Sequence, residues 1–513
     1  MDKNFYITTP IYYPSARPHM GHAYSSIIAD FFARFKRIDG FNVYFLTGTD
    51  EHGLKIQRAA EKNGIETSKF CDEISKTFKD LSKTLNLTNT DFIRTTEQRH
   101  KESVQHLWNE LKKNDDIYLS KYSGWYSVSD EAFYSDEEIE EIDGKKQSIS
   151  SKSPVEWMDE ESYFFRLSKW EKPLLDFYKK NPDFISPESR KNEVISFVKS
   201  GLKDLSVSRK SFSWGIKVPN DNDHVIYVWL DALTNYISAL NYPNKDDDLY
   251  KKYWPASIHL IGKDILRFHA IYWPAFLLAA KIEPPKKVYG HGWILSNDQK
   301  MSKSKGNILD PLEIINEYGL DPLRYYLIKE VSFGNDGNIS QERLEDCINS
   351  DLANNYGNLC QRVITFAIKN CQSKIPEKVE FEKEDLDILE KFSKNLALIR
   401  NKIDNQDINF YINFIVNSLF EANKYFNDQE PWRKKDDITR LNTIVYTTLE
   451  IVRKISFLLY PIIPESTLKA LKIFNINENE ISLSTVANND FLVKGNSINK
   501  IDILFNKIEK KDD

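Results

Sequence analysis

Two short stretches of the chain contain residue types that can hold phosphate groups. The first is His19-Met20-Gly21-His22, in which two imidazoles three residues apart share one face of a helix and can donate to phosphate oxygens. Gly21 has no Cβ, which allows a base or a phosphate to approach the backbone closely. The second is Lys300-Met301-Ser302-Lys303-Ser304, which offers two ammonium groups and two hydroxyls. Together they predict stabilisation of the charge that develops during phosphoryl or nucleotidyl transfer.

Each stretch has a simpler interpretation when it is considered separately. The two histidines could be caps at a helix start, and the lysines could lie in a solvated surface loop. The first stretch follows a strand predicted over Phe5–Thr9 and ended by Pro10, and a helix is predicted from Gly21 onward. Its apolar positions recur at helical spacing: Ala23, Ile27, Phe31 and Phe35. A helix N-terminus attracts anions through its N–H groups and dipole, so the position favours a phosphate site.

The strands and helices that must position these residues are predicted to form an α/β fold. A second strand is predicted over Asn42–Leu46, and the early alternation of strand and helix favours a Rossmann-like, doubly wound parallel sheet. Further strands are predicted over Val225–Trp229, Ser257–Ile261 and Val288–Ile294. From about Ser350 the pattern is helical, which predicts a C-terminal helical bundle. One helix of that bundle is marked by Ile444, Thr448, Ile451, Ile455 and Leu459.

The predicted domains follow these changes of pattern. We expect an inserted domain at 118–215 between two halves of the catalytic domain, with a hairpin at Ser123–Glu131 and a solvated loop in the charged run Asp136–Lys146. The predicted ranges are 1–117 and 216–299 for the catalytic halves, 118–215 for the insertion, 300–350 for the lysine loop and a stem-contact region, 351–475 for the helical domain and 476–513 for a tail.

Composition excludes several classes of protein. With 513 residues the chain is too long for a single core, and its net charge of −6 gives no global basic character. None of the four cysteines forms a C-x-x-C pair, which argues against structural zinc and a disulfide framework. The N-terminus has no secretory or organellar signal pattern, and no apolar run reaches the roughly 18 residues of a membrane span. We therefore expect a cytoplasmic protein, preferably of the bacterial cytosol, with an organellar matrix as the minor alternative.

The two motifs occur in an order that resembles class I aminoacyl-tRNA synthetases, and more closely the methionyl-tRNA synthetase family. The resemblance covers nearly the whole chain. Its matching stretches are Tyr12–Pro14, Gly48–Gly53, Val228–Ala232, Gly262–Ile265 and Gln429–Trp432. The resemblance implies methionine–tRNA ligase activity: methionine carboxylate attacks the α-phosphorus of ATP, and the terminal ribose of tRNA then takes the acyl group, with its 2′-hydroxyl first.

The family resemblance also implies which residues bind methionine. Asp50 would bind the α-ammonium group, and its simpler interpretation is the N-cap of the following helix. The side-chain pocket would consist of Ile11, Tyr13, Trp229, Leu233, Tyr236, Ile265, His269 and Trp273. Apolar and aromatic walls suit a polarisable thioether. Core packing is the alternative for the two tryptophans, and a satisfied core histidine is the alternative for His269. Leu233 stands where many relatives have proline.

By the same resemblance, ATP would contact both motifs and one strand end. The implied ATP-binding residues are His19, Gly21, His22, Gly290, His291, Gly292, Lys300 and Lys303, of which His19, His22, Lys300 and Lys303 would be catalytic. Arg209 and Lys263 are further candidates near the reaction centre, and an ordinary surface arginine is the alternative for Arg209. We expect Mg²⁺ to accompany ATP.

The implied RNA-binding residues lie in the helical region. Asn358 and Arg362 are four residues apart on one face, and Trp432 follows Pro431 at a helix start. The resemblance implies that they hold a CAU anticodon, and amide, guanidinium and indole groups suit base edges and stacking. A hydrophobic staple is the alternative for Trp432. The expected partners are methionine, ATP and both initiator and elongator tRNA(Met).

The chain departs from the family in two ways. Many relatives carry C-x-x-C pairs in the insertion, but this insertion has no cysteine, so we expect a zinc-free version in which Trp125, Tyr126 and Phe133 pack where metal would bind. The extra C-terminal domain that often dimerises relatives is not present in this sequence, so a monomer is expected. Two rival functions stay open: a class I synthetase for another apolar amino acid, and a non-catalytic tRNA-binding paralogue.

Overall fold

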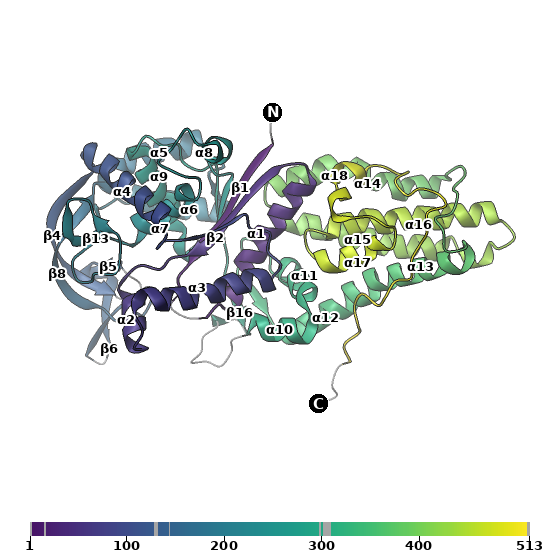
Figure 1. The fold of residues 1–513 in the computed structure, drawn as a ribbon, viewed down its shortest axis with the longest axis horizontal. Helices are drawn as coiled ribbons and strands as arrows, with labels where there is room; N and C mark the ends of the chain where they lie inside the picture. The colour runs from purple at the N-terminus through teal and green to yellow at the C-terminus, as the bar shows by residue number, and fades with distance from the viewer. Residues whose placement is uncertain are drawn as a thin grey trace. The chain divides into compact units, whose positions relative to one another are not determined.

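The chain divides into two compact units, which are described separately. The computed structural model describes residues 3–14, 17–127, 132–142, 144–296 and 309–509, together with the backbone of 299–300. The sheet unit comprises Asn4–Pro18 and Val43–His291, and the helical unit comprises Met1–Lys3, His19–Asn42 and Gly292–Asp513. Figure 1 traces both units along the chain.

The sheet unit is built on a six-stranded sheet with the order β3-β2-β1-β14-β15-β9. The pairings β2–β3, β1–β14, β14–β15 and β15–β9 are parallel, which confirms the predicted parallel α/β sheet. The order runs outward from β1 in both directions, so β1 and β14 flank a topological switch point, where such sheets bind ligands at the carboxyl ends of their strands. The strands are β1 Asn4–Tyr12, β2 Asn42–Thr49, β3 Asp91–Arg94, β9 Ile185–Ser186, β14 Ile258–Gly262 and β15 Val288–His291.

The predicted strands differ from the observed ones at their ends, and three of the differences have a clear cause. β1 does not stop at Pro10 but continues to Tyr12; its pairing with β14 is at Ile7 and Thr8, so the missing N–H of proline costs this pairing nothing. The strand predicted through Trp229 ends at Ile226, because a helix begins at Val228.

The predicted strand Val288–Ile294 is broken in two at Gly292. The two parts are β15 and β16 (Ile294–Ser296). A Cβ on Gly292 would lie 2.1 Å from the backbone of Asn335, so only glycine allows these two chain segments to approach so closely.

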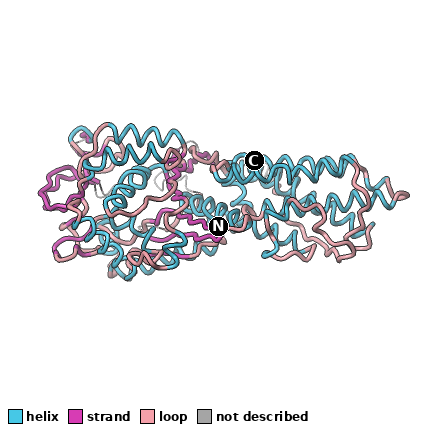
Figure 2. The backbone as a smooth tube through the Cα atoms, turned by 90° about the horizontal axis from the view of Figure 1, so that it is seen from above, coloured by secondary structure: helices cyan, strands magenta, loops and turns pink. Residues whose placement is uncertain are grey.

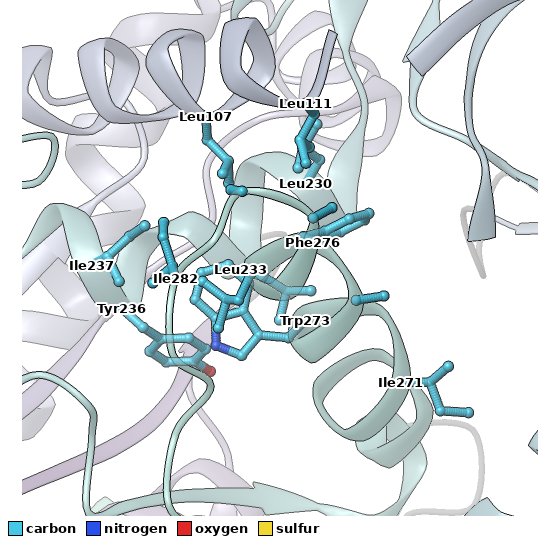
Figure 3. Packing of buried hydrophobic residues seen from close by; sticks show 14 of the residues in the cluster. Leu107, Leu111, Leu230, Leu233, Tyr236, Ile237, Ile271, Trp273, Phe276 and Ile282 are labelled. Carbon is cyan, nitrogen blue, oxygen red and sulfur yellow. The ribbon is translucent and has the colours of Figure 1, made fainter. Parts of the chain in front are cut away.

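Helices and a shared core surround this sheet. The α-helices are α2 Leu54–Lys62, α3 Thr67–Thr84, α4 Gln98–Lys113, α5 Glu171–Lys180, α6 Glu188–Lys199, α7 Val228–Ser238, α8 Asp248–Tyr253 and α9 Trp273–Ala279. Short 3₁₀ turns are η2 Leu167–Trp170 and η3 Lys263–Ile265, and η4 Phe268–Tyr272 is a π-helical turn. Figure 3 shows part of the core, with Leu107 and Leu111 of α4 near Leu230 of α7, and Tyr236 beside Trp273.

The predicted insertion contains a second sheet, which is antiparallel and has the order β10-β8-β4-β5. Its strands are β4 Ile117–Ser127, β5 Ala132–Tyr134, β8 Glu156–Phe165 and β10 Leu205–Ser206, and a three-stranded sheet follows with β11 Ser208–Arg209, β12 Lys217–Val218 and β13 Asp221–Ile226. β4 and β5 form the predicted hairpin, of which Val128, Ser129, Asp130 and Glu131 lie outside the described residues. The stretch 118–215 is not a fully separate domain, because one of its strands, β9, pairs with β15 of the six-stranded sheet.

The charged run was predicted to be a loop, and this is wrong. It forms a 3₁₀ turn, η1 (Asp136–Glu138), and an antiparallel hairpin of β6 (Ile139–Ile142) with β7 (Lys145–Ser148). Alternating strand residues pair across this hairpin, for example Glu140 with Gln147, so charged side chains can stay in solvent while the backbone bonds are satisfied.

The helical unit begins with α1 (Met20–Ile38), the predicted helix after the first motif. A small sheet of β16, β17 (Gln299–Lys300) and β18 (Gly337–Ile339) follows, with α10 Pro311–Tyr318, α11 Leu320–Glu330 and α12 Gln341–Cys347. The predicted bundle is confirmed, and Figure 2 shows its helices in cyan joined by pink loops. It comprises the π-helix η6 Ile348–Gly357, α13 Asn358–Asn370, α14 Lys383–Asp404, α15 Ile408–Asp428, the 3₁₀ turn η7 Pro431–Arg433, α16 Ile438–Leu459 and α17 Pro464–Lys472.

The end of the chain is packed rather than extended as a tail. It contains the 3₁₀ turn η8 (Glu478–Glu480) and α18 (Leu483–Val486), and buried Leu492, Ile498 and Phe505 follow. Buried Lys454 of α16 donates to the Asn488 carbonyl at 2.8 Å, which ties this segment to the bundle. Across the described parts of the chain, no helix combines the length and apolarity needed to cross a membrane.

Candidate functional site

The carboxyl ends of the central strands bring four of the nine predicted methionine-binding residues, together with Lys263, to one edge of the sheet. Ile11 lies at the end of β1 with Tyr13 just beyond it, Asp50 follows β2, and Lys263 and Ile265 follow β14. This edge is the switch point, so the fold itself marks it as the ligand-binding side. The resemblance implied these residues one by one, and the topology places them at one edge of the sheet.

The loop after β2 holds Asp50 firmly. Its backbone N–H donates to the Tyr12 carbonyl at 2.9 Å, and the residue is only 8% exposed. The next residue, Glu51, is buried and accepts two hydrogen bonds from Arg94, at 2.7 and 2.9 Å. Asp50 is not a helix cap, because α2 begins at Leu54 with Gly53 as its N-cap. The capping alternative is thus wrong, and the buried carboxylate suits a cationic partner.

Helix α7 supplies one wall of the site. Trp229, Leu233 and Tyr236 recur at spacings of four and three and so share one face of the helix. Leu233 and Tyr236 are buried in the main core, and Trp229 and Ile265 are partly buried against it. Tyr13 packs elsewhere, in a smaller cluster with α2 and α3, and its hydroxyl donates to the His52 carbonyl at 3.1 Å.

His269 and Tyr236 form a buried pair whose protons are fixed by their partners. The Nδ1 of His269 lies 2.9 Å from the Ile265 carbonyl, so it must carry the proton. Its Nε2 therefore accepts from the Tyr236 hydroxyl at 2.7 Å. Burial outweighs the Ile265 carbonyl and lowers the pKa of His269 to about 4, so the ring is neutral at pH 7. This is the satisfied core histidine left open as an alternative, placed on a π-helical turn of the kind common at functional sites.

A second buried histidine, His259, was missed. Its Nε2 accepts from the Trp273 indole at 3.3 Å, and its Nδ1 lies 2.9 Å from the Thr8 hydroxyl. Burial holds the pKa of His259 well below its usual range, with the neighbouring His269 adding to the effect. Its ring stacks on Tyr236 with centroids 4.0 Å apart, so it sets the position of two predicted pocket residues. The only sequence signal was a histidine within an otherwise apolar strand.

Phe268 was missed as well. Its ring stacks on Trp229 with centroids 3.6 Å apart and an interplanar angle of 13°. The spacing of three from Ile265 is the signal that could have identified it. Trp229 and Phe268 also line a cavity of about 530 Å³ with Tyr227, Tyr272 and Arg209. We call Trp229, Leu233, Tyr236, Ile265, Phe268, His269 and Trp273 the aromatic cluster.

Arg209 is buried, so the surface alternative is wrong. It lies in β11, and its guanidinium donates to the Ser206 hydroxyl and the Ser208 carbonyl, both at 2.6 Å. The guanidinium carbon lies 3.7 Å from the centroid of the Tyr227 ring, a cation–π contact. Lys263 opens η3 at the end of β14, and Gly290 and His291 form the end of β15. Each of these stands at a strand end or in the cavity wall, where a ligand could reach it.

The histidines of the first motif cap α1, as the simpler interpretation allowed. The Gly21 N–H donates to the Nδ1 of His19, and the His19 N–H donates to the Nδ1 of His22, both at 3.1 Å. Because each Nδ1 accepts, each neutral ring carries its proton on Nε2. Burial, aided by His19, holds the pKa of His22 well below its usual range. A Cβ at Gly21 would lie 2.9 Å from the His19 ring, so glycine is needed for the cap itself.

Some of the predicted residues lie outside the described part of the structure. The segment Met301–Ser304, which includes Lys303, lies outside the described residues, as does the side chain of Lys300. In the insertion, Tyr126 is buried with Phe212 and Val225, whereas the Phe133 side chain is also outside the described part. Trp125 packs edge-on against Trp157 with ring centroids 5.1 Å apart. The described residues contain no group of three potential metal ligands.

The predicted RNA-binding residues lie on the surface of the bundle. The guanidinium of Arg362 donates to the Asn427 side-chain oxygen at 2.7 Å, and it lies 5.6 Å from the Phe426 ring centroid. Phe426 in turn meets Trp432 edge-on, with ring centroids 6.1 Å apart. Asn358 is exposed one turn before Arg362 at the start of α13. We call Asn358, Arg362, Phe426, Asn427 and Trp432 the bundle cluster.

Trp432 is not a hydrophobic staple. It lies in the short 3₁₀ turn η7, five residues before the N-cap of α16, Asp437, whereas a staple residue directly precedes the cap. Its side chain stays 39% exposed, which leaves a face of the indole available for stacking. Phe426 and Asn427 were missed, and only the fold places them beside Arg362.

Comparison with known proteins covers the whole chain. A family model described as tRNA synthetases class I (M) matches residues 5–364, and one described as the anticodon binding domain of methionyl tRNA ligase matches residues 375–513. Among similar sequences, the Methionine--tRNA ligase of Rickettsia felis is 49% identical over 99% of both chains. That of Brucella suis biovar 1 is 48% identical over 92% of both.

Similar solved structures come from Mycobacterium tuberculosis. Its methionyl-tRNA synthetase in complex with methionyl-adenylate has a TM-score of 0.96 and 44% identity, covering 98% of this chain and 99% of that one. The apo form has a TM-score of 0.90 and 41% identity, covering 100% of this chain and 99% of that one. The likeness therefore extends through both units and is not limited to the motifs.

Proposed function

The chain belongs to the methionyl-tRNA synthetase family of class I aminoacyl-tRNA synthetases, and we propose that it joins methionine to initiator and elongator tRNA(Met). A carboxylate oxygen of methionine attacks the α-phosphorus of ATP, the bond to the bridging oxygen breaks, and pyrophosphate leaves. A hydroxyl of the 3′-terminal ribose then attacks the acyl carbonyl of methionyl-adenylate, and AMP leaves. Neither step needs a covalent bond to the protein.

Methionine recognition would combine Asp50 with the aromatic cluster. One observation supports this proposal: a buried carboxylate follows β2, and a set of aromatic side chains is packed on α7, η4 and α9 of the same unit. The Asp50 carboxylate would hold the α-ammonium, and flat rings would enclose the thioether. The Tyr236 hydroxyl donates a hydrogen bond to neutral His269, so the cluster offers no charge to the substrate side chain. Selection would therefore depend on shape, and an unbranched chain fits between flat rings better than a β-branched one.

The phosphate groups would be held by hydrogen-bond donors and fixed charges. The Nε2–H groups of His19 and His22 would donate to phosphate oxygens, and Lys300 and Lys303 would neutralise the charge on pyrophosphate as it leaves. Gly290, His291 and Gly292 would contact adenosine. Arg209 and Lys263 are further donors for the reaction centre.

ATP would arrive with Mg²⁺. The two motifs offer N–H groups, ammonium groups and two serine hydroxyls but no carboxylate, so Mg²⁺ would be held mainly through the phosphates. It would add to the neutralisation of phosphate charge. We further propose a zinc-free insertion, because residues 118–215 contain no cysteine, and a monomeric enzyme of the bacterial cytosol.

The anticodon would bind the bundle cluster. Asn358 and Arg362 would contact base edges, and the exposed indole of Trp432 would stack on one unpaired base. A CAU anticodon is the expected sequence.

Amino-acid-dependent exchange of pyrophosphate into ATP tests the function. Methionine should drive exchange at least about 100-fold more efficiently than leucine, isoleucine, valine or cysteine, as expected when shape excludes competitors. Better exchange with leucine or isoleucine would identify a different synthetase, and no exchange with any amino acid would favour a tRNA-binding paralogue. Charging of a CAU tRNA, with the same tRNA carrying a changed anticodon as the control, tests the second step.

A further inference from the structure

Helix α7 has a polar face opposite the one that carries Trp229, Leu233 and Tyr236. Asp231 and Ser238 lie seven residues apart on this face, and both contact buried histidines. Asp231 is 1% exposed. Its Oδ2 accepts from the Nδ1 of His52 and its Oδ1 accepts from the Nε2 of His100, both at 2.7 Å.

The carboxylate is ionised despite its burial. Burial by itself would raise the pKa of Asp231, but the two histidines outweigh it and lower the pKa to about 2. A carboxylate only accepts hydrogen bonds, so both rings must donate to it.

His100 contacts α7 through both ring nitrogens. Its Nε2 lies 2.7 Å from the Asp231 carboxylate, and its Nδ1 lies 3.0 Å from the Ser238 hydroxyl oxygen. The Asp231 carboxylate is thus held between His100 and His52. Burying a carboxylate contributes little net stability even when it is hydrogen-bonded, because desolvation offsets the attraction. The contacts of Asp231 therefore call for an explanation in geometry.

His52 connects Asp231 to the loop that carries Asp50. It lies two residues beyond Asp50, and its carbonyl accepts from the Tyr13 hydroxyl at 3.1 Å while its ring is held by Asp231. The loop is thus fixed to the same helix that presents Trp229 and Tyr236 on its other face. Methionine has its ammonium group at one end and its thioether at the other, so this connection sets the spacing of the two subsites.

We propose that Asp231 is a positioning residue that holds the ammonium-binding loop in register with the aromatic cluster. The inference rests on the proposed function. It predicts that loss of the Asp231 charge weakens ligands that need both subsites and spares ligands that need only the aromatic cluster. Small displacements suffice, because a shift of about 1 Å can cost on the order of 100-fold in a positioned site.

Two probes separate these cases: methioninol, and 4-(methylthio)butan-1-ol, which differs from it only by lacking the amino group. Competitive inhibition of pyrophosphate exchange is measured in the wild type and in Asp231→Asn. We expect methioninol and the KM for methionine to weaken by roughly 10- to 100-fold, and the deamino probe by less than about threefold. The kcat at saturating methionine should change less than KM.

The matched control is Asp91→Asn, which removes another partly buried carboxylate of this unit, paired with Arg99 at 2.7 Å and remote in sequence from the Asp50 loop. Equal weakening of both probes in Asp231→Asn, no weakening of either, or the same selective loss in Asp91→Asn would each overturn the proposal. Wild-type protein without methionine-dependent exchange would instead refute the proposed function.

If Asp231→Asn does not fold, two variants of His52 test the same proposal. His52→Ala removes the link, whereas His52→Asn keeps an N–H donor close to the position of Nδ1. The alanine variant should weaken methioninol selectively, and the asparagine variant should restore most of that binding. Equal behaviour of the two variants contradicts a positioning role.

Discussion

The aromatic cluster and the bundle cluster use similar side chains in opposite ways. In the aromatic cluster, polar groups are buried and paired with one another, as His269 is with Tyr236. In the bundle cluster, Trp432 and Asn358 are exposed, and the contacts are ring edges and one amide oxygen. A small ligand is selected by a rigid, desolvated shape, whereas an RNA loop needs faces that stay open. A substitution of the same kind should therefore reduce ligand affinity more in the aromatic cluster than in the bundle cluster.

The largest effect should follow from removing the ammonium partner. Asp50→Ala should lower kcat/KM for methionine in pyrophosphate exchange by roughly 10³-fold, the size expected when a desolvated charge loses its partner. Affinity for tRNA, measured by filter binding, should stay within about twofold of wild type. A loss of exchange below tenfold would remove Asp50 from the ammonium site.

Substitutions in the bundle cluster should affect tRNA binding and leave methionine activation unchanged. Trp432→Ala should raise the KM for tRNA by roughly 10- to 100-fold, since stacking contributes about 1–3 kcal/mol per base, and exchange should be unchanged. Phe420→Ala is the matched control: it is an aromatic residue of α15, 66% exposed and outside the cluster. If Phe420→Ala has the same effect, the cluster is not specific.

Acid should destabilise the region around the aromatic cluster. The pKa of His269 is about 4 in the folded protein, below its usual value, so the unfolded chain takes up a proton at a higher pH than the folded one. The stability from keeping this ring neutral is complete above about pH 6.5 and is lost as pH falls towards 4. Lowering the pH from 7 to 5 should therefore reduce the free energy of unfolding by about 2 kcal/mol through His269.

Urea unfolding at the two pH values measures this loss. His269→Asn keeps a donor for the Ile265 carbonyl but cannot titrate, so its stability should fall less between pH 7 and 5. An equal fall in both proteins would assign the acid sensitivity to other groups, of which buried His259 is the first to test by the same substitution.

Removing a single hydrogen-bond donor from the aromatic cluster should have a moderate effect. Tyr236→Phe leaves the Nε2 of His269 without its donor, and an unsatisfied buried acceptor costs about 1–3 kcal/mol. The KM for methionine should rise about tenfold, with aminoacylation of saturating tRNA reduced in proportion. An unchanged KM would mean that the pair only fills the core.

Removing a hydrogen-bond partner from the bundle cluster should have the smallest effect on enzyme kinetics. Asn427→Ala removes the oxygen that Arg362 contacts, but water can replace it at this accessible site, so the KM for tRNA should rise about threefold. A rise as large as that of Trp432→Ala would show that Arg362 must be held as rigidly as the buried pair.

Much of this arrangement could be predicted from sequence. The helical spacing after Gly21, the parallel sheet and the C-terminal bundle depend on local periodicity, and all three are confirmed. The errors have local causes as well. The strand predicted through Trp229 was made too long, because the helix that begins at Val228 has no side-chain cap to mark its start. The charged run forms a hairpin and not a loop, because strand pairing satisfies its backbone hydrogen bonds.

What the sequence by itself determined are the residue types and their order: two phosphate-binding motifs, a carboxylate after a strand, and a stretch without cysteine. Only the tertiary structure decided how those residues are held. His269 meets Tyr236 across 33 positions, Asp231 meets His52 across 179, and Thr8 meets His259 across 251. Which nitrogen of a buried ring carries its proton depends on such distant partners, because burial removes the water that would otherwise serve as one.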